Sequence, residues 1–251
     1  MTGTLVLPGV MGALIGSFLN VVAYRLPRGE SLVHPGSHCT TCGATVRPWH
    51  NLPIVGWLLL RGRCHNCGEQ ISARYPIVEA VTAGLYLAVV ADKGFDRDAV
   101  LPILLVTALV PIALTDLDRR IIPNAITGPA AVAGIAVALL VHTGGVPERL
   151  IAAAAAFGAF LLVALAAPGG MGMGDVKLVG VLGIYLGSAV APAILIALLT
   201  GSLAGAVVMS RKGVRAGRKT TIAFGPFLVL GGLACIFAGP QIIDFYTDHV
   251  L

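Results

Sequence analysis

Long apolar runs alternate with short polar segments along the whole chain. Eight of these runs approach the roughly 20 residues that a membrane-spanning helix needs. They cover residues 4–24, 76–91, 99–117, 125–142, 149–167, 176–188, 190–209 and 222–243. The sixth run is short, and Gly187 and Pro192 mark the predicted turn between it and the seventh. The pattern predicts an all-α polytopic membrane protein with about eight transmembrane helices.

Composition supports this interpretation. The chain is 57% hydrophobic and 12% charged, with a mean hydropathy of +0.89, whereas a soluble domain carries about 25% charged residues. The one long polar segment divides the chain into a first transmembrane helix over residues 1–24, a loop over residues 25–75 and a helical bundle over residues 76–251. The lipid bilayer is therefore an expected partner, and the sequence does not define an oligomeric state.

The positions of the basic residues predict the orientation. Lys and Arg collect in cytoplasmic loops, and eight spans with both termini outside place 14 of the 17 Lys and Arg residues on one face. These are Arg25, Arg28, Arg47, Arg61, Arg63, Arg74, Arg119, Arg120, Lys177, Arg211, Lys212, Arg215, Arg218 and Lys219. We therefore expect a multi-pass protein of the inner or plasma membrane, with the loop in the cytoplasm. The net charge of +5 reflects topology, and no nucleic-acid partner is expected.

The polar loop carries a four-cysteine pattern. Cys39 and Cys42 form one C-x-x-C pair, and Cys64 and Cys67 form a second pair after a gap of 21 residues. Four thiolates at this spacing predict a structural zinc site, with a glycine after each pair to permit the turn. Two disulfides are the alternative, but they are rare in the cytoplasm. Zinc would stabilise a loop that has too few apolar residues for a core of its own.

Two aspartates lie at the edges of apolar runs, where a carboxylate is costly and is interpreted as functional by default. Asp116 ends the third run, and Asp118 follows two residues later. Their side chains point about 200° apart on a helix, so only one of them can face the interior of a bundle. Asp118 is followed by two arginines and is expected to be solvated.

Asp175 follows a glycine-rich segment, GGMGMGD over residues 169–175. Irregular backbone at membrane depth is tolerated where protein or a water cavity surrounds it. Gly172 and Gly174 would then offer backbone to a substrate strand, with Lys177 nearby as a further substrate-binding candidate. The alternative is that Asp175 only caps the next helix. If Asp116 and Asp175 meet, they can share one proton and activate a water molecule.

Two other functions use the same residues. A proton-coupled transporter could use the two aspartates as a relay, although both are expected near one membrane face. A zinc-stapled membrane scaffold would need neither of them for catalysis. No Walker motif or serine–histidine nucleophile pattern is present to support a different chemistry.

Several motifs in order resemble one known family. They are GSFLNVVAYRLPRG (16–29), SHCTTCG (37–43), LRGRCHNCG (60–68), RYPIVEA (74–80), TDLDRRIIPN (115–124), GMGDVK (172–177) and FGPFL (224–228). The chain resembles the bacterial type IV prepilin peptidases, which are membrane aspartic proteases with a Gly-x-Gly-Asp motif. The resemblance covers almost the full length of the chain.

This resemblance implies a function and assigns residues. It makes Asp116 and Asp175 catalytic and implies cleavage of the leader peptide from prepilin or pseudopilin substrates. It also implies N-methylation of the new N-terminus with S-adenosylmethionine as methyl donor, because the cysteine loop is complete. For the methyl-transfer site the resemblance points to the N-terminal part, where Gly62 and Glu79 are candidates. Their structural alternatives are a loop turn for Gly62 and an ion pair with Arg74 or Arg25 for Glu79.

Overall fold

The chain folds into helices that form two compact units. The computed structural model describes residues 2–141, 143–167, 170–213 and 223–250. Within these residues the regular elements are helical, apart from two isolated β-bridges in the cysteine loop. Contacts divide the chain into Met1–Ala99 and Val100–Leu251. Arg215, Arg218 and Lys219, which were predicted on the cytoplasmic face, lie outside the described residues.

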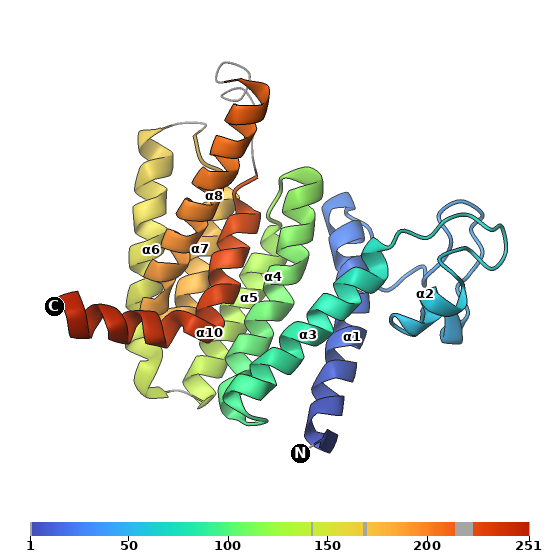
Figure 1. Ribbon diagram of the computed structural model, residues 1–251, viewed down its shortest axis with the longest axis horizontal. Coiled ribbons are helices and arrows are strands. Elements are labelled where there is room, and N and C mark those ends of the chain that lie inside the picture. Colours follow the sequence, from blue (N-terminus) through green and yellow to red (C-terminus); the bar gives the residue numbers. More distant parts are fainter. Residues whose placement is uncertain (1, 142, 168–169, 214–222, 251) are drawn as a thin grey trace. The chain divides into compact units, whose positions relative to one another are not determined.

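The first unit consists of two long antiparallel helices and the loop between them (Figure 1). Helix α1 (Thr2–Arg25) packs on α3 (Arg74–Lys93), with Gly16 of α1 beside Glu79 and Gly9 beside Leu87. The side-chain amide of Asn20 donates a hydrogen bond to the Tyr75 carbonyl, at 3.3 Å. The loop contains the short elements η1 (Leu26–Arg28), η2 (Pro48–Asn51) and α2 (Val55–Leu59), and η3 (Arg97–Ala99) follows α3.

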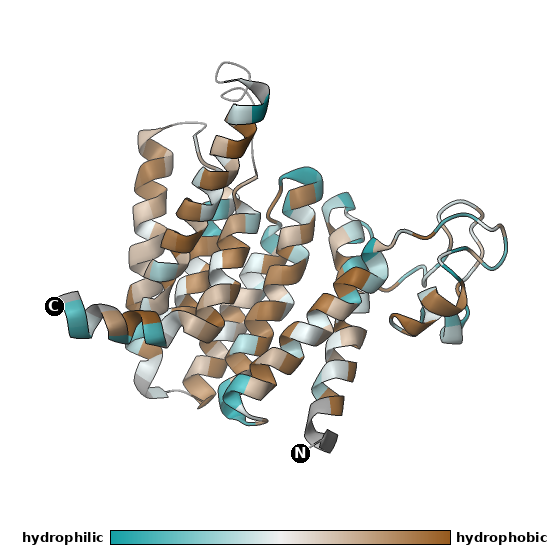
Figure 2. Ribbon diagram, viewed as in Figure 1, coloured by the Kyte–Doolittle hydropathy of each residue, from teal (hydrophilic) through white to brown (hydrophobic). Residues whose placement is uncertain are grey.

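The second unit is a helical bundle that surrounds a buried helix, α7. The unit comprises α4 (Val100–Arg119), α5 (Asn124–Val141), η4 (Thr143–Gly145), α6 (Val146–Ala166), α7 (Met173–Leu186), η5 (Gly187–Ala189), α8 (Val190–Lys212) and α10 (Gly225–Val250). Nine of the 14 residues of α7 are buried, and α7 packs against α4, α5, α6 and α10. Figure 2 shows apolar residues along the long helices and hydrophilic residues near several helix ends.

The chain reverses direction between α7 and α8, as the sequence predicted at Gly187. Gly187 has a left-handed φ of 60°. Two neighbouring residues of α6 hold this turn: Glu148 accepts a hydrogen bond from the Ser188 N–H at 2.9 Å, and Arg149 donates to the carbonyls of Ile184 and Tyr185. Pro192 lies inside the first turn of α8, beyond the reversal.

Contacts along α10 confirm the reversal. Gly232 of α10 lies beside Leu182 of α7, and the starts of both helices touch Ile122, so α10 runs parallel to α7. Gly231 lies beside Ala193 of α8 and Phe227 lies beside Gly201, so α10 runs antiparallel to α8. The ends of α4 and α8 and the start of α7 therefore share one end of the bundle.

When spans are counted by helix length and composition alone, the described residues contain fewer spans than long helices. Six described stretches are long and apolar enough to cross a membrane, one of them a continuous helical stretch, Met173–Arg211, that contains α7 and α8. A seventh is obtained if the two arms of α10, Gly225–Gly239 and Gln241–His249, count as one span bent by 72°. Helix α7 alone is about 21 Å long, shorter than the roughly 30 Å hydrocarbon core. The count of eight spans stays a prediction.

Candidate active site and metal site

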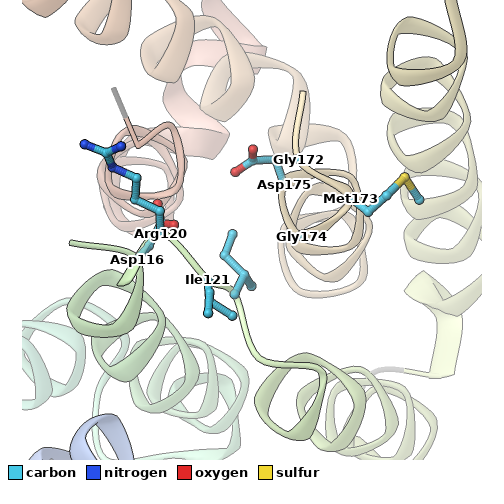
Figure 3. Close-up of a pocket in the computed structure, with 8 residues that line it drawn as sticks. Asp116, Arg120, Ile121, Gly172, Met173, Gly174 and Asp175 are labelled. Carbon is cyan, nitrogen blue, oxygen red and sulfur yellow. The ribbon is translucent and has the colours of Figure 1, made fainter. Parts of the chain in front are cut away.

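A cavity of about 260 Å³ lies at the end of the bundle where α4 ends and α7 begins. Its lining contains both predicted catalytic aspartates and both predicted substrate-binding glycines. The lining residues are Asp116, Arg120, Ile121, Ile122, Gly172, Met173, Gly174 and Asp175. Figure 3 shows the Asp175 carboxylate directed toward the side on which Asp116 and Arg120 lie. The fold thus brings together two carboxylates that are 59 residues apart in the sequence.

Helix α4 places Asp116 on its buried face. The side chain is 5% exposed and follows Thr115, which is fully buried. Asp118, two residues later, is exposed, as the helical geometry predicted. The left-handed Arg120, with φ 54°, ends the helix and turns the following Ile121–Ile122 segment along the cavity wall.

Asp175 is the third residue of α7 and is only partly buried. Gly172 is the N-cap residue, in an extended conformation, and the Asp175 N–H donates a hydrogen bond to the Gly172 carbonyl at 3.0 Å. The Asp175 carboxylate in turn interacts with the Gly172 N–H, as in the return half of a capping box. The carboxylate therefore stabilises the helix start and faces the cavity, so the two alternative roles from the sequence are compatible.

The charges in the cavity interact with one another. Asp175 is close enough to Asp116 for their carboxylates to repel each other, and Arg120 attracts Asp116 from four residues further along the chain. A pair of carboxylates with restricted access to water favours a state in which one of them holds a proton. Such a pair can act as acid and base on one water molecule.

Gly225, at the start of α10, is a site residue that the sequence analysis missed. A β-carbon at this position would lie 2.5 Å from Asp116 Oδ2 and 3.3 Å from the Ile122 side chain. The Gly225 N–H interacts with the carboxylate, but Oδ2 of Asp116 is a buried oxygen without a hydrogen bond in the described part of the chain. The motif FGPFL contained the relevant glycine, but nothing in it indicated contact with Asp116.

Lys177, the third predicted substrate-binding residue, has a hydrogen-bond partner on another helix. Its Nζ donates a hydrogen bond to Asn124 Oδ1 at 2.9 Å. Lys177 is outside the set of cavity-lining residues. It is the fifth residue of α7 and links this helix to the first residue of α5. Its contribution in the described structure is to hold these two helix starts together beside the cavity.

The four loop cysteines form a second cluster that could hold a metal ion. Their Sγ atoms all lie within 4.8 Å of one another, and those of Cys39 and Cys67 are 3.8 Å apart. Tetrahedral thiolate ligands at about 2.3 Å from zinc lie about 3.8 Å apart, so the donor set and its spacing fit zinc. All five cysteines of the chain are free thiols, so the structure contains neither disulfide of the alternative interpretation.

Both C-x-x-C pairs have the same backbone turn. The glycine after each pair, Gly43 or Gly68, has a φ near 70° and donates its N–H to the first cysteine of the pair at 2.9 Å. A β-bridge flanks each turn, His38 to Thr45 and Arg63 to Gln70. The predicted need for glycine at these two positions is confirmed.

The thiols in the cluster differ in acidity. The N–H of Cys42, followed by that of Thr41, lowers the pKa of Cys39 to about 6, because both stabilise the thiolate. For Cys67 the Glu69 N–H lowers the pKa, but desolvation and the other three cysteines raise it to about 12. The four thiols therefore do not ionise at the same pH, and four thiolates held together need a cation to balance their charge.

Gly62 and Glu79, the methyl-transfer candidates, have structural partners. Glu79 is 6% exposed, and its Oε2 accepts a hydrogen bond from the Ile54 N–H at 2.6 Å. Gly62 has a φ of 67°, and a β-carbon there would lie 2.8 Å from the Trp57 ring. Both residues therefore have a structural role in the loop, and their part in methyl transfer stays a prediction.

Comparison with known proteins identifies the family. The pattern of the Bacterial Peptidase A24 N-terminal domain matches residues 10–92, and that of the Type IV leader peptidase family matches residues 103–210. These matches fall in the first and second structural units, respectively. No solved structure matches the chain.

Three relatives share the name prepilin leader peptidase/N-methyltransferase. The chain is 37% identical to that of Myxococcus xanthus (strain DK1622), over 84% of this chain and 64% of the relative. It is 33% identical to that of Pseudomonas putida, over 93% and 90%, and 32% identical to that of Pseudomonas aeruginosa, over 95% and 92%. The chain thus spans less than two thirds of the first relative and about nine tenths of the other two. These matches show that the chain belongs to the type IV leader peptidase family, and the two carboxylates in one cavity agree with this assignment.

Proposed function

We propose that this protein is an aspartic endopeptidase that removes the leader peptide from type IV prepilins or pseudopilins. The observation that carries the proposal is the cavity that both Asp116 and Asp175 line, at one end of an apolar helical bundle. The names of the relatives supply the substrate class. A transporter relay is not favoured, because both carboxylates lie at the same end of the helical bundle, where α4 ends and α7 begins.

The two carboxylates would act as base and acid on one water molecule. The ionised carboxylate takes a proton from water as the water oxygen bonds to the scissile carbonyl carbon, and the protonated carboxyl donates its proton to the carbonyl oxygen. As the tetrahedral intermediate collapses, the C–N bond breaks and the departing nitrogen receives the proton that the base took from water. The hydroxyl of the intermediate returns its proton to the other carboxylate, so the pair regains one shared proton.

The cavity also supports substrate binding. Gly172 and Gly174 lie in its wall beside Asp175, and a glycine backbone leaves room for an extended substrate strand. Ile121, Ile122 and Met173 make part of the wall apolar. Lys177 would contribute indirectly, because its hydrogen bond to Asn124 fixes the position of the α7 start.

The four-cysteine cluster would hold a structural zinc ion. Zinc bound by Cys39, Cys42, Cys64 and Cys67 would supply folding energy to the loop without a chemical step. This assignment rests on the four mutually close thiols. Methyl transfer to the new N-terminus, with S-adenosylmethionine as donor, is supported by the names of the relatives alone, and its site stays a proposal in the N-terminal unit.

The basic residues support a cytoplasmic location of the cavity and the loop in the inner or plasma membrane, with both termini outside. Arg119, Arg120, Lys177 and Arg211 belong to the end of the bundle where the cavity lies. Arg149 lies at the opposite end, at the turn between α7 and α8. This distribution follows the preference of Lys and Arg for the cytoplasmic side.

The test is cleavage of a purified prepilin by the reconstituted full-length protein in ¹⁸O-labelled water, followed by mass spectrometry. The expected products are a leader with one labelled oxygen in its new carboxylate and a mature chain that gains a methyl group when S-adenosylmethionine is added. An uncleaved prepilin would refute the peptidase proposal. A cleaved but unmethylated product would refute the methyl-transfer proposal alone.

A further inference from the structure

Five exposed apolar side chains form a patch on the cysteine loop of the first unit, here called the loop patch. It comprises Trp49, Leu52, Val55, Leu58 and Leu59, which are between 49% and 64% exposed. The opposite side of this segment is closed, because Gly56 packs against the backbone of His50 and the Trp57 ring packs against Gly62. Large apolar side chains grouped in this way mark an interaction surface.

A hydrogen bond attaches the segment that carries the loop patch to α3, one of the membrane-spanning helices. The N–H of Ile54, just before α2, is bound to the Glu79 carboxylate at 2.6 Å. Glu79 lies five residues inside α3, about 7–8 Å along the helix axis from its first residue. A 20-residue helix such as α3 is only just long enough to cross the hydrocarbon core, about 30 Å. The start of α2 is therefore held at the boundary of the membrane.

Aromatic and basic residues of the kinds found at membrane–water interfaces occur in the loop patch and at the helix ends that flank the loop. Both tryptophans of the chain are in this segment, and the Arg47 guanidinium lies 5.8 Å from the Trp49 ring centre. Arg28, at the end of η1, lies 3.7 Å from the Tyr24 ring centre, and Tyr75 at the start of α3 is 41% exposed. Trp and Tyr concentrate at the headgroup level, and arginine is attracted to anionic headgroups.

We propose that the loop patch inserts into the headgroup region of the bilayer, so that the cysteine loop lies on the membrane surface. The partner is a lipid surface with anionic headgroups. The apolar side chains contact the upper acyl chains, and the arginines contact phosphates. Continuity with the spans α1 and α3, together with the anchor at Glu79, selects lipid over a soluble partner. This inference is independent of the proposed peptidase function.

Tryptophan quenching in vesicles tests the proposal. The full-length protein and its Trp49→Phe variant would be reconstituted in phosphatidylglycerol–phosphatidylethanolamine vesicles, and the difference between their emission spectra gives the Trp49 signal. This design leaves Trp57 unchanged and substitutes a side chain that is 55% exposed. Lipids brominated near the headgroup end of the acyl chain should quench Trp49 several-fold more than lipids brominated near the chain end. Aqueous iodide should quench it only weakly.

Two results would overturn the proposal. Strong quenching by iodide with none by brominated lipid would place Trp49 in water. Weak quenching by both would mean that protein covers Trp49. Equal metal content in the two proteins, measured in parallel, verifies that the four-cysteine cluster is intact in each.

Discussion

The aspartate cavity and the four-cysteine cluster are both assembled from residues far apart in the sequence, but they are held in place differently. The cavity rests on a bundle whose core side chains, such as Leu109, Ile112 and Leu182, are fully buried. The cysteine cluster lies in a loop where, within the described residues 26–73, Gly56 and Gly62 are the buried positions. Packing therefore orders the first site, and under the proposed function a bound metal ion would order the second.

Removal of the metal should produce the largest effect and confine it to the loop. Changing Cys39 and Cys64 together to Ser removes two of the four mutually close thiols, so metal content should fall from one ion per chain to none. Residues 26–73 should then become sensitive to protease, while the helical circular dichroism of the bundle stays unchanged. Cys235→Ala is the matched control, because Cys235 is buried against Ala189 and Ala193 and is not part of the cluster, and this variant should keep its metal. Full metal content in the double variant would contradict the prediction.

Gly225→Ala should damage the cavity without affecting the loop. The new β-carbon would lie 2.5 Å from Asp116 Oδ2, so the carboxylate must move. A displacement of about 1 Å at a catalytic group costs about 10²-fold in rate, and kcat/KM for leader cleavage should fall by that order. Gly205→Ala is the control, because a β-carbon there meets no atom within 4 Å. Equal rates for the two variants would mean that Asp116 tolerates the displacement.

Glu79→Ala should loosen the loop without removing its metal ligands. The Ile54 N–H, which is part-buried, loses its 2.6 Å acceptor, and the loss costs at most the roughly 1–3 kcal/mol of an unsatisfied buried donor. Hydrogen exchange over residues 54–60 should accelerate accordingly, whereas Glu79→Gln keeps an acceptor oxygen and should exchange more slowly than the Ala variant. If the Gln variant keeps loop protection but loses methylation of a pre-cleaved substrate, Glu79 has a role in methyl transfer as well.

Lys177→Met should have the smallest effect. It breaks the 2.9 Å hydrogen bond to Asn124, which at a partly exposed site contributes about 0.5–1.5 kcal/mol. KM for the prepilin should rise by less than about tenfold, since 1.4 kcal/mol is a factor of ten, and kcat should stay constant. Asn124→Ala should reproduce the change if Lys177 acts through Asn124. A much larger effect of Lys177→Met would indicate direct contact with substrate.

The sequence predicted the parts of both sites that depend on local pattern. Helical geometry separated Asp116 from Asp118, and the C-x-x-C-G repeats predicted both the clustering of the four thiols and the glycine turns. It could not predict that Gly225 lies against Asp116 or that Lys177 binds Asn124, because these contacts join helix ends 109 and 53 residues apart. The hydrogen bond between the Ile54 N–H and Glu79 could not be predicted either. The two residues are 25 positions apart, and the sequence does not show which of many possible donors the carboxylate binds.

The most direct test of the aspartate pair is the rate of leader cleavage by three single variants that remove one carboxylate each. Asp116→Asn and Asp175→Asn should each lower kcat by about 10²–10⁴-fold, the usual contribution of an acid or base catalyst. Asp118→Asn should retain the wild-type rate, because Asp118 is exposed on the other side of α4. Cleavage at the wild-type rate by either Asp116→Asn or Asp175→Asn would contradict the proposed catalytic pair.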